Sequence, residues 1–332
     1  MVSEVLYRKW RPQTLANVVG QRHVTQTLLN ALLQQRVAHA YLFSGPRGTG
    51  KTSTARILAR AINCSRNGQS EPCNECLLCK AATGGNALDI IEIDAASNRG
   101  IDEVRELRDR ANYLPTEARS KVYIIDEVHM MTTQAFNALL KILEEPPAHV
   151  IFILATTESH KVPSTIVSRC QRFDFRRLSR EVVEDRIQNI SEAEGMQVDS
   201  WVVRFIAKTS DGSLRDAENL LEQLLVSYGP SIEPIHLKNL LGISTDLPLN
   251  SIVSSMLNGN LKECLMTLHG ISNQGLSLNQ FHREVLEYLR SVMLVKAGAE
   301  DITDLINKDL EEVHAIASNI TINHVTKVMG IW

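Results

Sequence analysis

The sequence lacks any apolar run that could cross a membrane, and its first residues lack the pattern expected of a secretory leader. Its 332 residues contain no uncharged apolar stretch of about 18 residues, the length that a membrane-spanning helix needs. The N-terminus, MVSEVLYRKWRPQ, carries basic residues with no apolar segment behind them, whereas a signal peptide has one. We therefore expect a cytoplasmic protein that makes no membrane contact.

Internal repeats, low-complexity segments and a strong net charge are also missing. The formal net charge is -3, and 44% of the residues are hydrophobic and 22% charged, which is ordinary for a globular protein. At about 100 to 200 residues per domain, two or three domains are expected. The charge is uneven, because residues 1–60 hold nine basic residues against one acid, Glu4. A solvated basic surface with phosphate ligands and a surface facing a polyanion both explain this excess.

Strand-like and helical patterns alternate in the first half of the chain. Continuous apolar runs, typical of strands buried on both faces, occur at residues 40–43, 89–93, 122–125 and 151–155. Helical spacing of apolar residues lies between them. This alternation predicts an α/β domain with a parallel sheet over residues 1–178. Helical spacing alone follows, and we expect two helical domains, over 179–242 and 243–332. The sequence ends at VMGIW without a helix-capping residue, which favours an incomplete last domain.

A phosphate-binding loop follows the first strand-like run. GPRGTGKT fits the pattern G-x-x-x-x-G-K-[ST] and precedes a helix with Ala55, Leu58 and Ile62 on one face. Its glycines let backbone N–H groups point at phosphate oxygens. We expect Lys51 to reach the β and γ phosphates and Thr52 to bind Mg²⁺. The predicted nucleotide contacts are Gly45, Pro46, Arg47, Gly48, Thr49, Gly50, Lys51, Thr52 and Ser53.

Two carboxylates end the third strand-like run. In VYIIDEVH, neighbouring residues at the end of a strand point in different directions, so two roles are natural. We expect Asp126 to bind Mg²⁺ and Glu127 to orient or deprotonate the attacking water. With the phosphate loop, this motif predicts hydrolysis of ATP or GTP.

Four of the six cysteines lie close together in the sequence. Cys64, Cys73, Cys76 and Cys79 have the spacing C-x8-C-x2-C-x2-C, and in a reducing compartment such a cluster favours a metal over disulfides. Four thiolates can close a tetrahedral zinc site with no position left for catalysis. An iron–sulfur cluster is the alternative, although the C-x3-C-P ending of a ferredoxin is missing.

Several segments together resemble a known family. They are YRKWRPQTLANVVGQ, LFSGPRGTGKTS, IEIDAASNRGIDEVR, IIDEVHMMTTQAFNALLKILEEPP, ILATTE, VPSTIVSRCQRF and DGSLRDAENLL. In this order they closely resemble the gamma/tau family of subunits of the bacterial DNA polymerase III clamp loader, which are AAA+ ATPases. The resemblance runs from residue 4 to about residue 242. It implies a P-loop AAA+ domain, a helical lid over 179–242 and a helical collar over 243–332. It also implies ATP, Mg²⁺ and structural Zn²⁺ as bound groups, with zinc held by the inserted module 64–79.

The resemblance also assigns roles to individual residues. Thr157 matches the sensor-1 position, Arg215 the sensor-2 arginine of the lid, and Arg169 the arginine finger that completes a neighbouring subunit's site. The adenine pocket is implied near Tyr7, Arg11, Pro12, Val18, Val19 and Leu214, although core packing explains the apolar ones equally well. Contacts to the DNA backbone are implied at Asn98, Arg99 and Arg105, where a solvated helix face is the alternative.

The expected function is that of the ATPase motor of the clamp loader, a subunit of the DNA polymerase III holoenzyme. Its partners would be other clamp-loader subunits in a hetero-oligomeric ring, the sliding clamp and the backbone of primed DNA, at the replication fork in the bacterial nucleoid. DEVH also fits a DNA helicase, which would hydrolyse ATP on single strands without a clamp and would unwind duplex. A scaffold subunit without turnover is a further alternative, and the intact Lys51, Thr52, Asp126 and Glu127 count against it.

Overall fold

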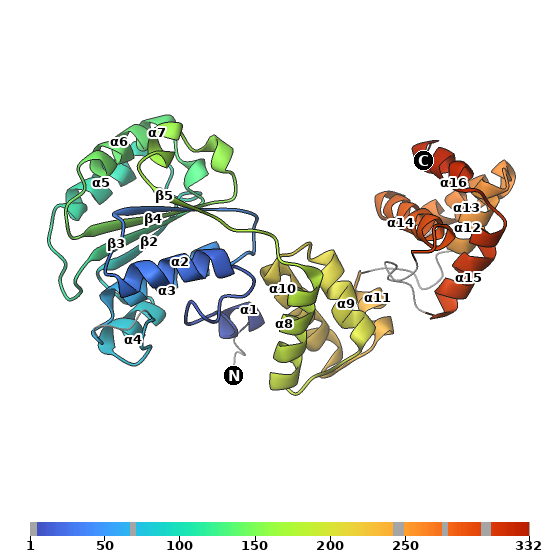
Figure 1. Cartoon of the computed structure of the whole chain (residues 1–332), viewed down its shortest axis with the longest axis horizontal. Helices are drawn as coiled ribbons and strands as arrows, with labels where there is room; N and C mark the ends of the chain where they lie inside the picture. Colours follow the sequence, from blue (N-terminus) through green and yellow to red (C-terminus); the bar gives the residue numbers. More distant parts are fainter. Residues whose placement is uncertain (1–4, 67–70, 242–248, 274–277, 300–306, 332) are drawn as a thin grey trace. The chain divides into compact units, whose positions relative to one another are not determined.

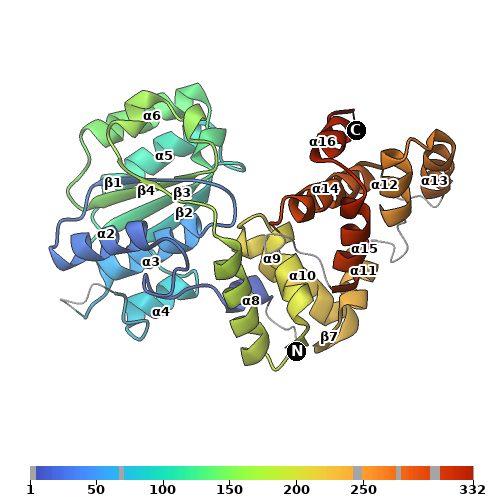
Figure 2. The same cartoon turned by 45° about the vertical axis from the view of Figure 1, so that its right-hand side comes forward.

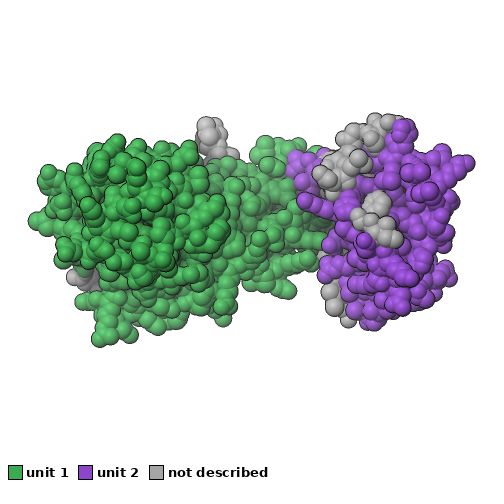
Figure 3. Space-filling view, turned by 90° about the horizontal axis from the view of Figure 1, so that it is seen from above, with its two compact units in different colours: residues 1–234 green, residues 235–332 purple. Residues whose placement is uncertain are grey.

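The computed structural model describes residues 5–66, 71–241, 249–273, 278–299 and 307–331. The chain forms two compact units, residues 1–234 and 235–332, coloured separately in Figure 3. The predicted boundary at 178/179 lies inside the first unit, and the one at 242/243 lies outside the described residues. The division into three domains therefore stays a prediction.

The first unit is built on a five-stranded sheet in which every pair of neighbouring strands is parallel. Its strands are β1 (Ala40–Ser44), β2 (Ile90–Asp94), β3 (Lys121–Asp126), β4 (Val150–Thr156) and β5 (Gln171–Asp174), in the order β2-β3-β4-β1-β5. The four predicted strands and their parallel arrangement are confirmed. The prediction of burial on both faces was wrong for β2, an edge strand that is only partly buried.

The other edge strand, β5, was not predicted. Its residues QRFD are exposed except for Phe173, because an edge strand buries fewer of its side chains than a central one. The sequence pattern of a buried strand is therefore absent there.

Helices cover both faces of the sheet (Figure 1). Helices α2 (Arg22–Leu33) and α3 (Lys51–Asn63) lie on one face, and α5 (Ile101–Ala111), α6 (Thr133–Glu144) and α7 (Ser164–Val167) lie on the other. Successive side chains of a strand point to opposite faces. Tyr41 and Phe43 of β1 accordingly pack in the core beside α2 and α3, and Leu42 packs in the core beside α5 and α6. This alternation gives a three-layer α/β/α arrangement.

The strand register brings the carboxyl ends of β1, β3 and β4 to one edge. Ile125 of β3 pairs with Leu154 of β4, and Thr156 of β4 pairs with Ser44 of β1. The segments after these strands are the phosphate loop, the turn η1 (Val128–Met130) and the turn η2 (Ser159–Lys161). Ligands of parallel α/β sheets bind at this edge. The insertion after α3 contains the cysteines and α4 (Leu77–Thr83).

The rest of the first unit is mainly helical. It contains α8 (Arg180–Ala193), α9 (Ser200–Thr209) and α10 (Leu214–Tyr228), and a short parallel pair, β6 (Gln197–Val198) and β7 (Ser231–Ile232), which was not predicted. The N-terminal helix α1 (Leu6–Lys9) lies beside α8 and α10 (Figure 2). The backbone N–H of Leu6 donates to Glu222 over 3.3 Å, and the Trp10 indole donates to Glu194 over 2.7 Å.

The described residues of the second unit form helices, as expected. They are α11 (Pro234–Leu241), which begins at the last residue of the first unit, α12 (Leu249–Leu257), α13 (Leu261–Asn273), α14 (Leu278–Lys296), α15 (Asn307–Ser318) and α16 (Ile322–Ile331). Phe281, Val285, Leu289 and Val292 form a buried stripe along α14 at the centre of this unit's core. Within the described part of the chain, no helix is long and apolar enough to span a bilayer.

Candidate nucleotide-binding site

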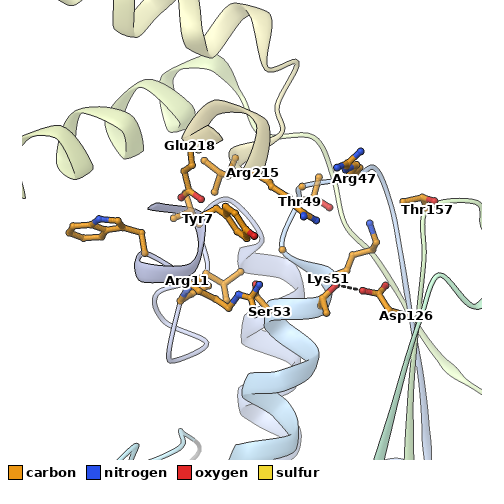
Figure 4. Close-up of a pocket in the computed structure, with 18 of the residues that line it drawn as sticks. Tyr7, Arg11, Arg47, Thr49, Lys51, Ser53, Asp126, Thr157, Arg215 and Glu218 are labelled. Carbon is orange, nitrogen blue, oxygen red and sulfur yellow. Dashed lines mark hydrogen bonds between the residues drawn. The ribbon is translucent and has the colours of Figure 1, made fainter. Parts of the chain in front are cut away.

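A cavity of about 520 Å³ lies between the sheet edge, α1 and the start of α10 (Figure 4). It brings together almost every residue predicted to contact nucleotide. The predicted residues that line it are Tyr7, Arg11, Pro12, Val18, Val19, Arg47, Gly48, Thr49, Gly50, Lys51, Thr52, Ser53, Asp126, Glu127, Thr157, Leu214 and Arg215. Gly45, Pro46 and Arg169 are not among its described lining residues.

The phosphate loop needs glycine for its backbone and for the close approach of α10. Gly48 and Gly50 have φ angles of 74° and 98°, a left-handed region that other residues rarely adopt. A Cβ atom on Gly48 would lie 1.9 Å from the Ser213 hydroxyl. The backbone N–H of Leu214 also donates to the carbonyl of Gly48 over 3.2 Å. The first turn of α10 therefore rests directly on the phosphate loop.

The Lys51 ammonium lies within the loop that surrounds it. It donates to the carbonyls of Gly45 and Pro46 over 2.8 and 2.7 Å. Burial lowers the pKa of Lys51, and the carboxylates of Glu127 and Asp126 oppose that shift. Phosphate oxygens would be stronger partners for this cation than neutral carbonyls, so the loop is suited to bind a polyphosphate.

Thr52 and Asp126 form the oxygen pair predicted for Mg²⁺. The Thr52 hydroxyl donates to Oδ2 of Asp126 over 2.7 Å, and Oδ1 of Asp126 accepts from the backbone N–H of Glu127 over 2.9 Å. Burial raises the pKa of Asp126, and these hydrogen bonds oppose the shift. A hydroxyl and a carboxylate at one edge of a phosphate loop fit Mg²⁺, which takes few protein oxygens and keeps several waters.

Glu127 has a constrained backbone and a held side chain. Its φ and ψ are 48° and 43°, unusual for a residue with a side chain. Its Oε2 accepts from the hydroxyl and the backbone N–H of Thr157 over 3.0 and 3.3 Å. The predicted sensor thus contacts the predicted catalytic carboxylate directly.

His129 was missed as a contact of the site. Its ring, with a side-chain exposure of 6%, lies 3.4 Å from Oε2 of Glu127 and 3.3 Å from Oε1 of Glu158. Its Nδ1 also lies 3.0 Å from the Thr156 hydroxyl. The histidine of DEVH was visible in the sequence, but only folding places it beside the ends of both β3 and β4.

The opposite end of the cavity is lined by aromatic and charged residues. The guanidinium of Arg215 lies 5.2 Å from the centre of the Tyr7 ring. Glu218, one turn further along α10, is 7% exposed and lies 3.7 Å from Arg186. Burial raises the pKa of Glu218 to about 7, and Arg186 opposes the shift only in part. Figure 4 shows Tyr7, Arg215 and Glu218 grouped away from Lys51 and Asp126.

Several of these lining residues were not predicted. They are Trp10, Asn17, Glu92, Asp94, Arg186 and Glu218. Glu218 follows Leu214 by four residues, so helical spacing could have placed both on one face of α10. Arg186 comes from a different helix and offered no such signal.

Arg169 and the predicted DNA contacts lie elsewhere in the first unit. Arg169 follows α7 and donates to Glu144 over 2.7 Å and to the carbonyl of Thr165 over 2.8 Å. Asn98 donates to the carbonyl of Asp94 over 3.0 Å, Arg99 is exposed, and Arg105 pairs with Asp102 over 3.1 Å. Asp102 and Glu103 stand in the first turn of α5 and reduce the attraction of that helix end for phosphate.

The four clustered cysteines converge. The sulfur atoms of Cys64, Cys73, Cys76 and Cys79 all lie within 4.8 Å of one another. The backbone N–H groups of Cys73, Cys76 and Cys79 donate to the sulfurs of Cys64, Cys73 and Cys76 over 3.3 to 3.4 Å. Tetrahedral zinc bonds of about 2.3 Å to sulfur imply sulfur separations of about 3.8 Å, close to the 4.0 Å between Cys73 and Cys79. The cluster is therefore compatible with zinc.

The acidities of these thiols differ. Burial would raise the pKa of Cys76, but hydrogen bonds to its sulfur outweigh it and lower the pKa to about 5. Burial raises the pKa of Cys79 to about 12. A divalent cation among the sulfurs would displace the protons that remain. Residues 67–70 of the predicted module lie outside the described part of the chain.

Comparisons with known proteins identify relatives of this chain. A family model described as DNA polymerase III, delta subunit, matches residues 20–179. The tau subunit of DNA polymerase III from Bacillus subtilis is 47% identical over 311 residues, which cover 93% of this chain and 55% of that protein. The gamma subunit from Buchnera aphidicola is 38% identical over 292 residues, which cover 88% of this chain and 79% of that protein. The chain spans about half the length of the tau relatives.

A solved structure has the same fold. RuvB from Thermotoga maritima, described as a Holliday junction branch migration motor, matches with a TM-score of 0.51 at 19% identity. The match covers 75% of this chain and 79% of RuvB.

A parallel sheet with a phosphate loop, an acidic strand end and a covering helical segment defines the class of AAA+ P-loop proteins. Within that class, the identity shared with the gamma and tau subunits shows that the chain belongs to the DNA polymerase III gamma/tau family.

Proposed function

We propose that the chain is an ATP-hydrolysing motor subunit of the DNA polymerase III clamp loader. The observation that carries this proposal is the convergence of Lys51, the Thr52–Asp126 pair and Glu127 with Arg215 around one cavity. Arg215 comes from the helical segment, so one site joins two parts of the first unit. Such a site can couple nucleotide binding to the position of the helices.

Each residue has a role that its surroundings support. Lys51 and the backbone of the phosphate loop bind the phosphates, and Thr52 and Asp126 hold Mg²⁺, which would neutralise charge on the phosphate oxygens. Glu127 accepts a proton from the attacking water, with Thr157 fixing the direction of its carboxylate. Arg215, whose guanidinium lies beside the Tyr7 ring in this structure, would turn toward the γ phosphate when nucleotide binds. The opposite end of the cavity, near Tyr7, Val18, Val19 and Leu214, receives the base.

Arg169 acts on a neighbouring subunit in this proposal. Its side chain is 34% exposed, pairs with Glu144 and lies outside the cavity of its own chain. An arginine supplied to another subunit's triphosphate is worth about 10³ to 10⁵ in rate in other NTPases. The protein would therefore work in a hetero-oligomeric ring with other clamp-loader subunits.

The remaining parts of the proposal concern the partners. The ring would open the sliding clamp and hold primed DNA by its backbone, with Asn98, Arg99 and Arg105 as candidate contacts. The four cysteines would bind a structural zinc ion. The helices of residues 243–332 would form the collar. We place this activity in the bacterial cytoplasm, at the replication fork.

The decisive experiment is an ATPase assay of the reconstituted complex, with and without clamp and primed DNA. We expect stimulation for the wild type and for the control Arg172→Ala, whose exposed arginine pairs with Asp174. Arg169→Ala should bind ATP normally but lose the stimulated rate by about 10³ or more. Full activity of Arg169→Ala would refute the proposal that Arg169 acts on the nucleotide of a neighbouring subunit. Stimulation by single-stranded DNA alone, with duplex unwinding, would favour a helicase, and no turnover would favour a scaffold subunit.

A further inference from the structure

Glu71, in the described part of the cysteine module (residues 64–66 and 71–79), holds a segment next to the nucleotide cavity. Its Oε2 accepts from the backbone N–H of Leu15, and its Oε1 from the N–H of Ala16, both over 2.8 Å. One carboxylate thus fixes two successive peptide groups 55 and 56 residues away in the sequence. Charged acceptors make stronger hydrogen bonds to N–H groups than neutral ones do.

Further contacts join the same two regions. The Asn74 amide donates to the carbonyl of Gln13 over 3.4 Å. Arg60 of α3 donates to the side chain of Gln13 over 2.6 Å and to the Thr83 hydroxyl over 2.8 Å. The Thr83 hydroxyl in turn donates to the carbonyl of Cys79. The segment 13–16, named the linking segment here, is therefore held by Glu71 and Asn74 of the module and by Arg60 at the end of α3.

The linking segment connects two groups of residues that line the cavity. Arg11 and Pro12 precede it, and Val18 and Val19 follow it. Its own interior contact is Leu15, which is fully buried in the core beside α2 and α3. Leu15 fixes the depth of the segment, whereas Glu71 fixes the direction of its peptide groups. The burial of Leu15 and the hydrogen bonds to Glu71 together position the residues that form the cavity wall near the expected nucleotide base.

We propose that the cysteine module positions the base-binding wall of the nucleotide cavity, with Glu71 as the positioning residue. This inference rests on the proposed nucleotide binding. Glu71 lies two residues before Cys73, so the cluster of four sulfurs restricts where the Glu71 carboxylate can lie. A metal ion bound by the four cysteines would restrict the module further, because joining these residues reduces the conformational freedom of the chain between them. The module thereby contributes to nucleotide affinity without touching the ligand.

The test compares Glu71→Ala with a matched control, each made in the chain of 332 residues. The control is Glu75→Ala, because Glu75 belongs to the same module but pairs with the exposed Arg66 over 2.6 Å. Three quantities are measured: zinc per chain, hydrogen exchange of the Leu15 and Ala16 amides, and the Kd of a fluorescent ATP analogue. We expect Glu71→Ala to keep its zinc, to exchange both amides faster and to raise the Kd by about tenfold. Glu71→Gln should lie between, and Glu75→Ala should match the wild type.

Several outcomes would overturn the inference. Faster amide exchange with an unchanged Kd would show that the contact does not serve the cavity. Unchanged exchange would show that Glu71 does not hold the linking segment. Loss of zinc from Glu71→Ala would show that Glu71 supports the cysteine cluster rather than the cavity wall. A wild type that binds no nucleotide would refute the proposed function. In that case the exchange measurement would still report whether Glu71 holds residues 15 and 16.

Discussion

The Thr157 hydroxyl donates to Oε2 of Glu127 over 3.0 Å. This bond joins the residue after β4 to the residue after β3, and the buried ring of His129 lies beside the same carboxylate oxygen. The backbone N–H of Thr157 donates to this oxygen as well. With three neighbours on one oxygen, the carboxylate of Glu127 has few available orientations. Its position relative to an attacking water is therefore set by the ends of two adjacent strands.

Removing the Thr157 hydroxyl should slow hydrolysis without weakening nucleotide binding. We expect Thr157→Ala to reduce kcat by about tenfold or more, because Glu127 loses a fixed direction for proton transfer. Thr157→Ser retains the hydroxyl and should recover most of the rate. Steady-state ATPase assays and a separate measurement of Kd check this. An unchanged kcat in Thr157→Ala would contradict the role of Thr157 in orienting Glu127.

Crowding of the phosphate loop can be separated from backbone strain. Gly48 and Gly85 have nearly equal φ angles of 74° and 75°, but only a Cβ atom on Gly48 would meet a neighbour. Each alanine variant should lose about 1 kcal/mol of stability through the backbone strain that both share, and Gly48→Ala should lose more because its Cβ would overlap Ser213. Gly48→Ala should also weaken binding of the ATP analogue, because it forces the loop away from Ser213. Equal nucleotide affinity in the two variants would show that the close approach of α10 does not matter for binding.

The buried Glu218 should make stability depend on pH. Its pKa is raised from 4.5 to about 7, so the folded protein binds a proton more tightly than the unfolded chain does. The resulting stabilisation is complete below about pH 4.5 and is lost as the pH rises through about 7. Relative to Glu218→Gln, the wild type should lose on the order of 2 kcal/mol between pH 5 and pH 8.

Thermal unfolding of the two proteins at pH 5, 6, 7 and 8 measures this difference. Glu106→Gln is the control, since the side chain of Glu106 is 62% exposed on α5. It should show a constant difference from the wild type across the range. A difference that is equally constant for Glu218→Gln would mean that the carboxyl is not neutralised by burial.

The four sulfurs should bind one zinc ion per chain. Cys76→Ser should lose the metal. Its unfolding temperature should fall, because metal binding no longer stabilises the folded insertion after α3. Elemental analysis and thermal unfolding of both proteins test this. Two or more irons per chain with visible absorbance would reject zinc. Cys170→Ser should keep the metal, since burial raises the pKa of this thiol to about 12 and it lies outside the cluster.

The sequence predicted the parts of the fold that rest on local patterns. The central strands β1, β3 and β4 were evident from continuous apolar runs, and α3, α5 and α6 from helical spacing. The edge strand β5 was not, because it buries one residue of four. The short pair β6 and β7 depends on contacts between residues more than thirty positions apart, which no local pattern reports.

The candidate site shows the same division. Lys51, Thr52, Asp126 and Glu127 belong to motifs whose chemistry can be recognised in a line of sequence. Arg186, Glu218 and Glu71 act through partners on distant segments, so their importance depends on the fold. Glu71 illustrates this most clearly, because its two partners are the backbone N–H groups of Leu15 and Ala16. Backbone groups carry no signal in the amino-acid sequence.

The pairing of β3 with β4 has a consequence for errors in folding. A slip of one residue would shift Thr157 along the strand by about 3.3 Å and turn its neighbours to the opposite face. Phe152 and Leu154, which pack beside α5 and α6, would then leave that layer. A chain with misaligned catalytic residues would therefore also have a poorly packed core. Cellular quality control that removes poorly packed chains would remove these inactive chains as well.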